Sequence, residues 1–171
     1  MKKWKSAVAA LCMGLVLSLG GILAWNQSVS AHCQIPCGIY DDAMRFTMLE
    51  EHVTTIEKSI NQIVDLSKDP AQNANQLTRW VMNKEDHADQ FAEIVTWYFL
   101  QQRIKPTEAR SGDEWDKYVL QIRLCHEMLV ATMKAKQTTD LQYTEQLRKL
   151  VDEFRHSYFT AEQLAHMKEH T

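Results

Sequence analysis

From residue 32 to its end, the chain contains very few residues that interrupt helices. Two glycines and three prolines occur there, namely Gly38, Gly112, Pro36, Pro70 and Pro106. Glycine and proline are the strongest local breakers of regular structure, so long stretches without them can remain helical. The breakers therefore divide this part of the chain into a short N-terminal segment and several long candidate helices.

The first long stretch carries a sustained heptad pattern of apolar residues. Their spacing alternates between three and four, as expected for a helix that buries one face. Asp41 and Asp42 are suitable residues for the start of this helix, and Asp69-Pro70 marks its end. The apolar positions are Phe46, Leu49, Val53, Ile56, Ile60 and Ile63.

Three further stretches repeat this pattern. We expect the second helix to run from about residue 71 to 104, the third to follow a loop at 105–112, and the fourth to begin after a cap at 138–140. A polar turn or short helix with His166 and His170 comes last. The apolar positions are Leu77, Val81, Ala88, Phe91, Val95 and Tyr98, then Trp115, Tyr118, Ile122, Cys125, Leu129 and Thr132, then Leu147, Val151, Phe154 and Tyr158.

These stretches together predict an all-α fold. No stretch alternates with period two for long enough to predict a strand. Four amphipathic helices with short connections indicate an antiparallel four-helix bundle, here over residues 41–171 with a short C-terminal tail. The apolar stripes would form the core of the bundle.

The first 31 residues differ from the rest of the chain. A basic end with three lysines precedes an apolar centre, and Val29 and Ala31 stand at positions −3 and −1 of a potential cleavage site. This organisation is typical of a secretory signal peptide, so we expect residues 1–31 to be removed and the protein to be exported, to a periplasmic, lumenal or extracellular space. An uncleaved membrane anchor is the alternative, because the apolar run approaches spanning length. The Gly20-Gly21 pair favours removal.

Removal of residues 1–31 would make the protein more acidic. The segment contains three lysines and no acidic residue, so the formal net charge would change from −3 to −6. An acidic protein with dispersed lysines and arginines is a poor candidate for nucleic-acid binding. It also lacks a basic amphipathic stretch, so we expect no membrane association after cleavage.

Cleavage after Ala31 would make residues 32–40, with the sequence HCQIPCGIY, the new N-terminus; we call this segment the metal-binding hook. His32 would then offer a free α-amine beside its imidazole. Cys33 and Cys37 add two thiolates, and a bound metal can displace the backbone N–H proton of Cys33. Such a donor set suits a square-planar metal such as nickel(II) or copper(II). Zinc prefers tetrahedral sites and commonly uses Cys-x-x-Cys pairs, which are absent here.

The cysteine count leaves two interpretations of the hook. Cys12 is lost with the signal peptide, and Cys33, Cys37 and Cys125 remain. Cys33 and Cys37 either form a disulfide or stay reduced as metal ligands. Cys125 falls on the apolar seam of the third helix, so we expect it to be a buried and unreactive thiol.

Other metal-ligand patterns in the chain are weak. A di-iron bundle needs the Glu-x-x-His pair twice, and one pair occurs, Glu153 and His156. We therefore do not expect a di-iron centre in the bundle. His52, His87 and His126 lie on or beside apolar seams, and we interpret them as structural histidines.

The motif His-Cys-x-x-Pro-Cys-Gly-x-Tyr at a processed N-terminus resembles the nickel-containing superoxide dismutases. The mature length and the helical pattern agree with that family over most of residues 32–160. The resemblance implies one nickel ion per subunit, held by the amine and axial imidazole of His32, the amide nitrogen and thiolate of Cys33, and the thiolate of Cys37. It also implies a homohexamer of four-helix bundles.

The resemblance also implies a reaction. One superoxide would reduce Ni(III) to Ni(II) and leave as dioxygen, and a second would reoxidise the metal and leave as hydrogen peroxide. Tyr40 corresponds to the family's tyrosine beside the open face of the metal. As the candidate catalytic residue, it would position small anions or water and restrict larger ligands, and we do not assign it as the proton donor.

The sequence departs from the family pattern around the hook. Gln34 stands where an Asp is frequent. Met48 falls where a Glu usually orients the axial imidazole, and Glu50 or Glu51 could replace that Glu after a small shift. His87 stands where the family has an Arg with the same task. A secretory signal in place of the short leader of many members implies an exported variant.

Three other functions are compatible with parts of this pattern. A non-enzymatic exported protein could bind nickel or copper with the same hook. A thiol–disulfide protein could use Cys33 and Cys37, but their spacing exceeds that of the thioredoxin-like motif by one residue and no βαβ pattern surrounds them. A copper centre that uses the amine and imidazole of His32 alone would leave both cysteines unexplained. We rank the superoxide dismutase first and the metal-binding protein second.

Overall fold

The computed structural model describes residues 42–169, with side chains to residue 165. The predicted signal peptide (1–31), the hook (32–40) and His170 lie outside the described residues. All regular elements in the described part are helices, which confirms the predicted all-α fold. They are α2 (Asp42–Leu66), α3 (Pro70–Glu93), η1 (Ile94–Arg103), α4 (Asp113–Gln137), α5 (Gln142–Tyr158) and α6 (Ala161–Glu169).

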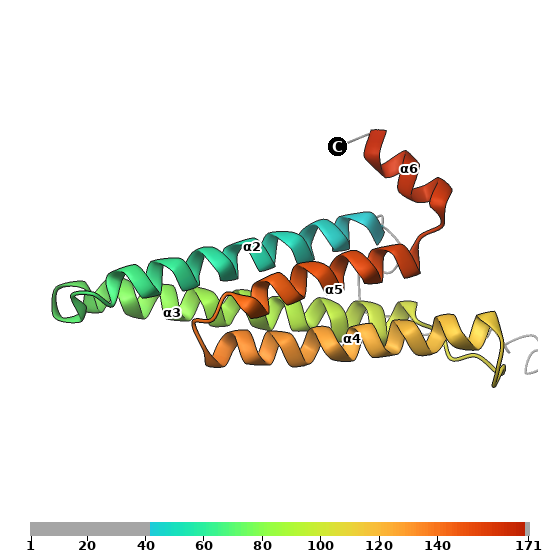
Figure 1. The fold of residues 1–171 in the computed structure, drawn as a ribbon, viewed down its shortest axis with the longest axis horizontal. Helices are drawn as coiled ribbons and strands as arrows, with labels where there is room; N and C mark the ends of the chain where they lie inside the picture. Colours follow the sequence, from blue (N-terminus) through green and yellow to red (C-terminus); the bar gives the residue numbers. More distant parts are fainter. Residues whose placement is uncertain (1–41, 170–171) are drawn as a thin grey trace, which may run out of the picture. The chain divides into compact units, whose positions relative to one another are not determined.

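Four long helices form the predicted bundle. The second consists of α3 and its continuation η1, which is a π-helix. Successive helices reverse direction at short connections, so that α2, α3, α4 and α5 run antiparallel (Figure 1). Helix α2 packs against α3 and α5, and α4 packs against the same two helices. None of the described helices is long and apolar enough to cross a membrane.

The core of the bundle contains the apolar faces of these helices. The heptad positions predicted for α2 are all buried, and so are Leu147, Val151 and Phe154 of α5. Burial of such side chains contributes about 1.5–3 kcal/mol each relative to full exposure. The largest fully buried side chains are Phe46, Phe91, Phe99, Phe154, Leu49, Ile56, Ile60, Leu124, Met128, Leu147, Val53 and Val95.

Two predicted seams differ from the observed core. In α3, Val81 is 41% exposed, and Lys84 takes a buried position in the seam. In α4, the buried face is rotated by about one residue, so that of the predicted positions only Cys125 and Thr132 are buried. The apolar pattern did not include Gln121, Ala131 and Ala135, so part of this face was missed. The buried face comprises Gln121, Leu124, Cys125, Met128, Ala131, Thr132 and Ala135.

The helix ends follow their sequence signals. Asp69 accepts a hydrogen bond from the Gln72 backbone N–H at 3.3 Å, with Pro70 at the first helical position. Asp140, one of the predicted cap residues, accepts one from the backbone N–H of Gln142 at 2.9 Å. Gly112 precedes α4 with a φ of 83°, a conformation that L side chains rarely adopt.

The predicted short C-terminal helix is present as α6. Thr160 and Gln163 form a capping box at its start, because each side chain accepts a hydrogen bond from the other residue's backbone N–H, at 3.3 and 2.9 Å. The backbone of His166 lies in this helix.

Candidate functional site

The predicted metal ligands His32, Cys33 and Cys37, and the candidate catalytic Tyr40, all lie outside the described residues. The described chain begins at Asp42, two residues after Tyr40. The structure therefore shows the first residues of the bundle that follow the hook in the sequence.

Asp42 is the centre of a hydrogen-bond network at this end of the bundle. Tyr98 donates to its Oδ1, and Arg103 donates to its Oδ2. Tyr158 also donates to Oδ2, at 2.8 Å, and Arg103 Nε donates to the Tyr158 oxygen at 3.1 Å. The donors come from η1 and α5, so that Asp42 joins the start of α2 to two other elements. We call these four residues the Asp42 network.

The network controls the charge of its members. Burial alone would raise the pKa of the Asp42 carboxyl, but the hydrogen bonds from Tyr98, Tyr158 and Arg103 outweigh this effect and lower it. Burial and the neighbouring Asp42 raise the pKa of Tyr98 to about 12, and the pKa of Tyr158 is raised mainly by burial. At neutral pH, Asp42 is therefore an anion held by two neutral phenols and one guanidinium.

Aromatic side chains pack beneath the Asp42 network. The Phe46 ring lies 5.1 Å from the Phe99 ring and 5.7 Å from the Tyr158 ring. The Arg45 guanidinium lies 4.7 Å from the centre of the Tyr98 ring, a cation–π geometry. Arg45 Nε is buried and has no hydrogen-bond partner among the described residues. This cluster gives the network an apolar support, in which the Arg45 Nε–H has no partner among the described residues.

The candidate orienting residues in α2 have partners within the bundle. Met48, at the position where a Glu was expected, is half-buried against the core, and its sulfur lies 3.6 Å from Arg45 Nη1. Glu50 pairs with Arg155 of α5 at 2.6 Å. Glu51 is exposed. Of the two glutamates, Glu50 is thus already engaged in an ion pair between helices.

His52 and His87 meet across the interface between α2 and α3. Their Nδ1 atoms lie 2.9 Å apart, and His52 is buried. Burial, and then the nearby His87, lower the pKa of His52, while Glu51 acts in the opposite direction. This contact agrees with the structural interpretation of both histidines, whereas His126 is exposed on α4. The sequence contains one indication that these histidines lie near the core, since each is adjacent to a predicted seam position.

The remaining candidate ligands do not assemble into a metal site. Cys125 is fully buried, which confirms the predicted buried position, and burial raises the pKa of its thiol to about 12, as is typical of an unreactive cysteine. Glu153 and His156 are both exposed on α5. Among the described residues, no group of three or more His, Cys, Asp or Glu side chains could hold a metal ion.

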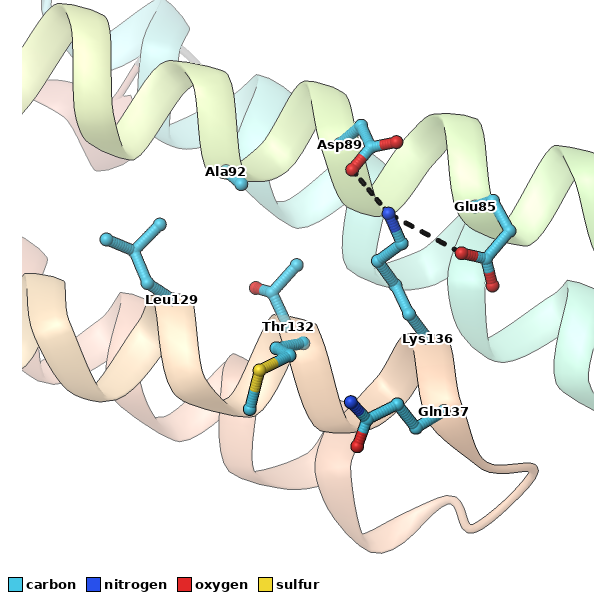
Figure 2. A pocket seen from close by; sticks show the side chains of 8 residues that line it. Glu85, Asp89, Ala92, Leu129, Thr132, Lys136 and Gln137 are labelled. Atoms are coloured by element: carbon cyan, nitrogen blue, oxygen red, sulfur yellow. Dashed lines mark hydrogen bonds and ion pairs between the residues drawn. The ribbon is translucent and has the colours of Figure 1, made fainter.

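An ion-paired groove lies between α3 and α4 (Figure 2). Its volume is about 390 Å³, and Lys136 reaches across it to Asp89 at 2.6 Å and to Glu85 at 3.5 Å. None of these three charged residues is a predicted seam position. The ion pairs of this lysine with both carboxylates join α3 to α4. None of these three charged side chains is unpaired.

The fold and the network define an all-helical bundle with an anchored N-terminal end. The family model of nickel-containing superoxide dismutases matches residues 27–162, about four fifths of the chain, which include the hook and the four bundle helices. The chain belongs to this family. It is an oxidoreductase that disproportionates superoxide, and its cofactor is nickel. No curated protein and no solved structure matched the chain.

Proposed function

We propose that the hook, residues 32–40, holds the nickel ion of this dismutase after cleavage behind Ala31. The amine and imidazole of His32, the amide nitrogen and thiolate of Cys33, and the thiolate of Cys37 would be the ligands. This donor set fits nickel, because nitrogen and thiolate donors favour its square-planar form. Metal binding would also keep both cysteines reduced outside the cell.

Bound nickel would supply a one-electron couple, Ni(II)/Ni(III). One superoxide would give up an electron and leave as dioxygen, and a second would accept an electron and two protons and leave as hydrogen peroxide. The thiolates of Cys33 and Cys37 would donate charge to the metal, which brings the reduction potential of this couple into the range needed for both superoxide reactions. Tyr40 would position the small anion or water and restrict larger ligands.

One observation carries this assignment. The only segment with two cysteines at close spacing immediately precedes the bundle of a nickel-containing family. Within residues 42–169, by contrast, the cysteine is buried and no cluster of three ligands exists. The donors that nickel requires are therefore concentrated in the hook.

The place of action and the assembly belong to the same proposal. Residues 1–31 have the organisation of a signal peptide, so the dismutase would act after export, without membrane association once the peptide is removed. By family resemblance it would assemble as a homohexamer.

Serine substitutions in the hook test the ligand assignment. Cys33→Ser and Cys37→Ser should each abolish nickel binding, the thiolate-to-nickel charge-transfer absorption and dismutation, with unchanged helicity by circular dichroism. Cys125→Ala is the matched control and should retain all three properties, because Cys125 is buried in the core. Dismutation at the parental rate in either hook variant would rule out the assignment.

A non-enzymatic nickel or copper binding protein is the second candidate. It would use the same ligands, so metal content alone does not distinguish the two. The family match favours the enzyme. The distinguishing measurement is the dismutation rate of the nickel-loaded protein, which should exceed that of the same concentration of free nickel ion.

A further inference from the structure

The Asp42 network is placed where the hook joins the bundle. Asp42 is the first residue of α2, and its carboxylate takes hydrogen bonds from Tyr98, Arg103 and Tyr158. The Asp42 side chain is 15% exposed, whereas that of Arg103, at the edge of the network, is 36% exposed. Charge-assisted hydrogen bonds of this kind are about twice as strong as neutral ones. The start of α2 is therefore fixed relative to η1 and α5.

The covalent chain limits how far the hook can be from this fixed point. An extended chain spans at most about 3.6 Å per residue. Tyr40 is two residues before Asp42, and Cys37 is five residues before it. The Cα atoms of these residues consequently lie within about 7 Å and about 18 Å of the Asp42 Cα. The hook is thus joined to the network by a short covalent connection.

The π-helix η1 explains how one element supplies two of the donors. Tyr98 and Arg103 are five residues apart, and both lie in η1. In a π-helix the hydrogen bonds join residues five apart, as the bond from Ile104 N to Phe99 O at 2.9 Å illustrates, so such residues are neighbours on one face. In an α-helix the neighbours are three or four apart. The π geometry is therefore what presents Tyr98 and Arg103 together to Asp42.

We propose that the Asp42 network positions the metal-binding hook, with Arg103 and Tyr158 acting through Asp42 as positioning residues for the dismutation reaction. This inference rests on the proposed function, because it takes residues 32–40 as the nickel site. Arg45 supports it, since its buried Nε lies in the same cluster and has no partner in the described part of the chain.

The test compares three variants of the processed, nickel-loaded protein. Asp42→Asn weakens the whole network, and Tyr158→Phe removes one hydroxyl from it. Glu57→Gln is the matched control, because it breaks the Arg148–Glu57 ion pair between the same helices α5 and α2, fifteen residues further along α2. Each variant is measured for the energy of the thiolate-to-nickel absorption, for kcat and KM separately, and for helicity.

We expect Asp42→Asn to shift the absorption and to lower kcat by about tenfold to hundredfold at unchanged helicity. The reason is that small displacements of a reacting centre strongly lower the reaction rate. Tyr158→Phe should change both properties in the same direction by less, and Glu57→Gln should change neither. If Asp42→Asn does not fold, Tyr158→Phe decides. The proposal is overturned if the network variant that folds keeps the parental absorption and a kcat within about twofold of the parent, or if Glu57→Gln has an equal effect.

These outcomes separate this inference from the nickel assignment itself. If Cys33→Ser retained the parental absorption and activity, the hook would not be the nickel site, whatever the Asp42 variants do. If Cys33→Ser abolishes both while Asp42→Asn leaves both unchanged, the hook binds nickel but does not depend on the network.

Discussion

Two histidines illustrate how single residues couple the stability of the bundle to pH. The Nδ1 atoms of His52 and His87 are in hydrogen-bond contact, which requires that at least one of the two is unprotonated. Burial and the proximity of His87 lower the pKa of His52 despite the opposing effect of Glu51. A histidine in an unfolded chain titrates near about 6.5. The folded protein thus binds a proton at His52 less readily than the unfolded chain does.

The free energy of unfolding should therefore decrease as the pH falls below about 6.5, because the unfolded chain then takes up a proton that folded His52 resists. His52→Gln should reduce this pH dependence between about pH 5 and pH 7, as measured by urea unfolding at several pH values. His126→Gln, at an exposed position on α4, should leave the dependence unchanged. Equal slopes for the parent and His52→Gln would show that the pair does not act in this way.

At the scale of elements, a buried lysine terminates α4. Lys84 of α3 is 5% exposed, and its Nζ donates to the carbonyl oxygens of Ala135 at 3.2 Å, Lys136, and Thr138 at 3.3 Å. The last carbonyls of a helix have no partner within the helix, and a cation is favourable there. Lys84 therefore compensates for its own burial and caps the end of a neighbouring helix.

Lys84→Met should lower the free energy of unfolding by about 2–3 kcal/mol, because several carbonyls lose a charged donor while the apolar stem is retained. Chemical denaturation measures this loss. Lys149→Met, at an exposed position with a distant Glu153 partner, should stay within about 0.5 kcal/mol of the parent. A loss for Lys84→Met as small as that of the control would mean that the carbonyls are hydrated without cost.

The sequence predicted the helices better than their contacts. The few breakers and the heptad spacing located the four bundle helices, and the second was expected to end at about residue 104, close to the end of η1 at Arg103. The π geometry of η1 was not foreseen, because apolar positions such as Phe91, Val95 and Tyr98 also fit an α-helix. Lys84 was missed in the seam because its charge hides its apolar stem.

The candidate site was predictable only in part for a similar reason. The hook is a contiguous motif, so it can be read from adjacent letters of the sequence. The Asp42 network joins residues up to 116 positions apart, and its assembly depends on the register of three elements. Such register is set by packing across the bundle and is not encoded in any one stretch. The ligand set of the hook stays a prediction.

At the scale of the whole molecule, we propose that the chain divides its tasks between two segments, the hook and the bundle. The family match covers both the hook and the bundle. The described bundle residues contain no cluster of three metal ligands, but they hold the start of α2 through the Asp42 network. In this account the bundle supports the hook, and the hook carries the nickel chemistry after it has been exposed by cleavage.

The most direct measurement of this account is the dismutation rate of a protein with one additional residue before His32. The added residue moves the α-amine away from His32 and leaves every side chain in place. We predict that this protein keeps the helicity of the parent but loses the thiolate-to-nickel absorption of the processed form and its dismutation activity. Dismutation at the parental rate in the extended protein would contradict the central claim that the processed N-terminus is the nickel site.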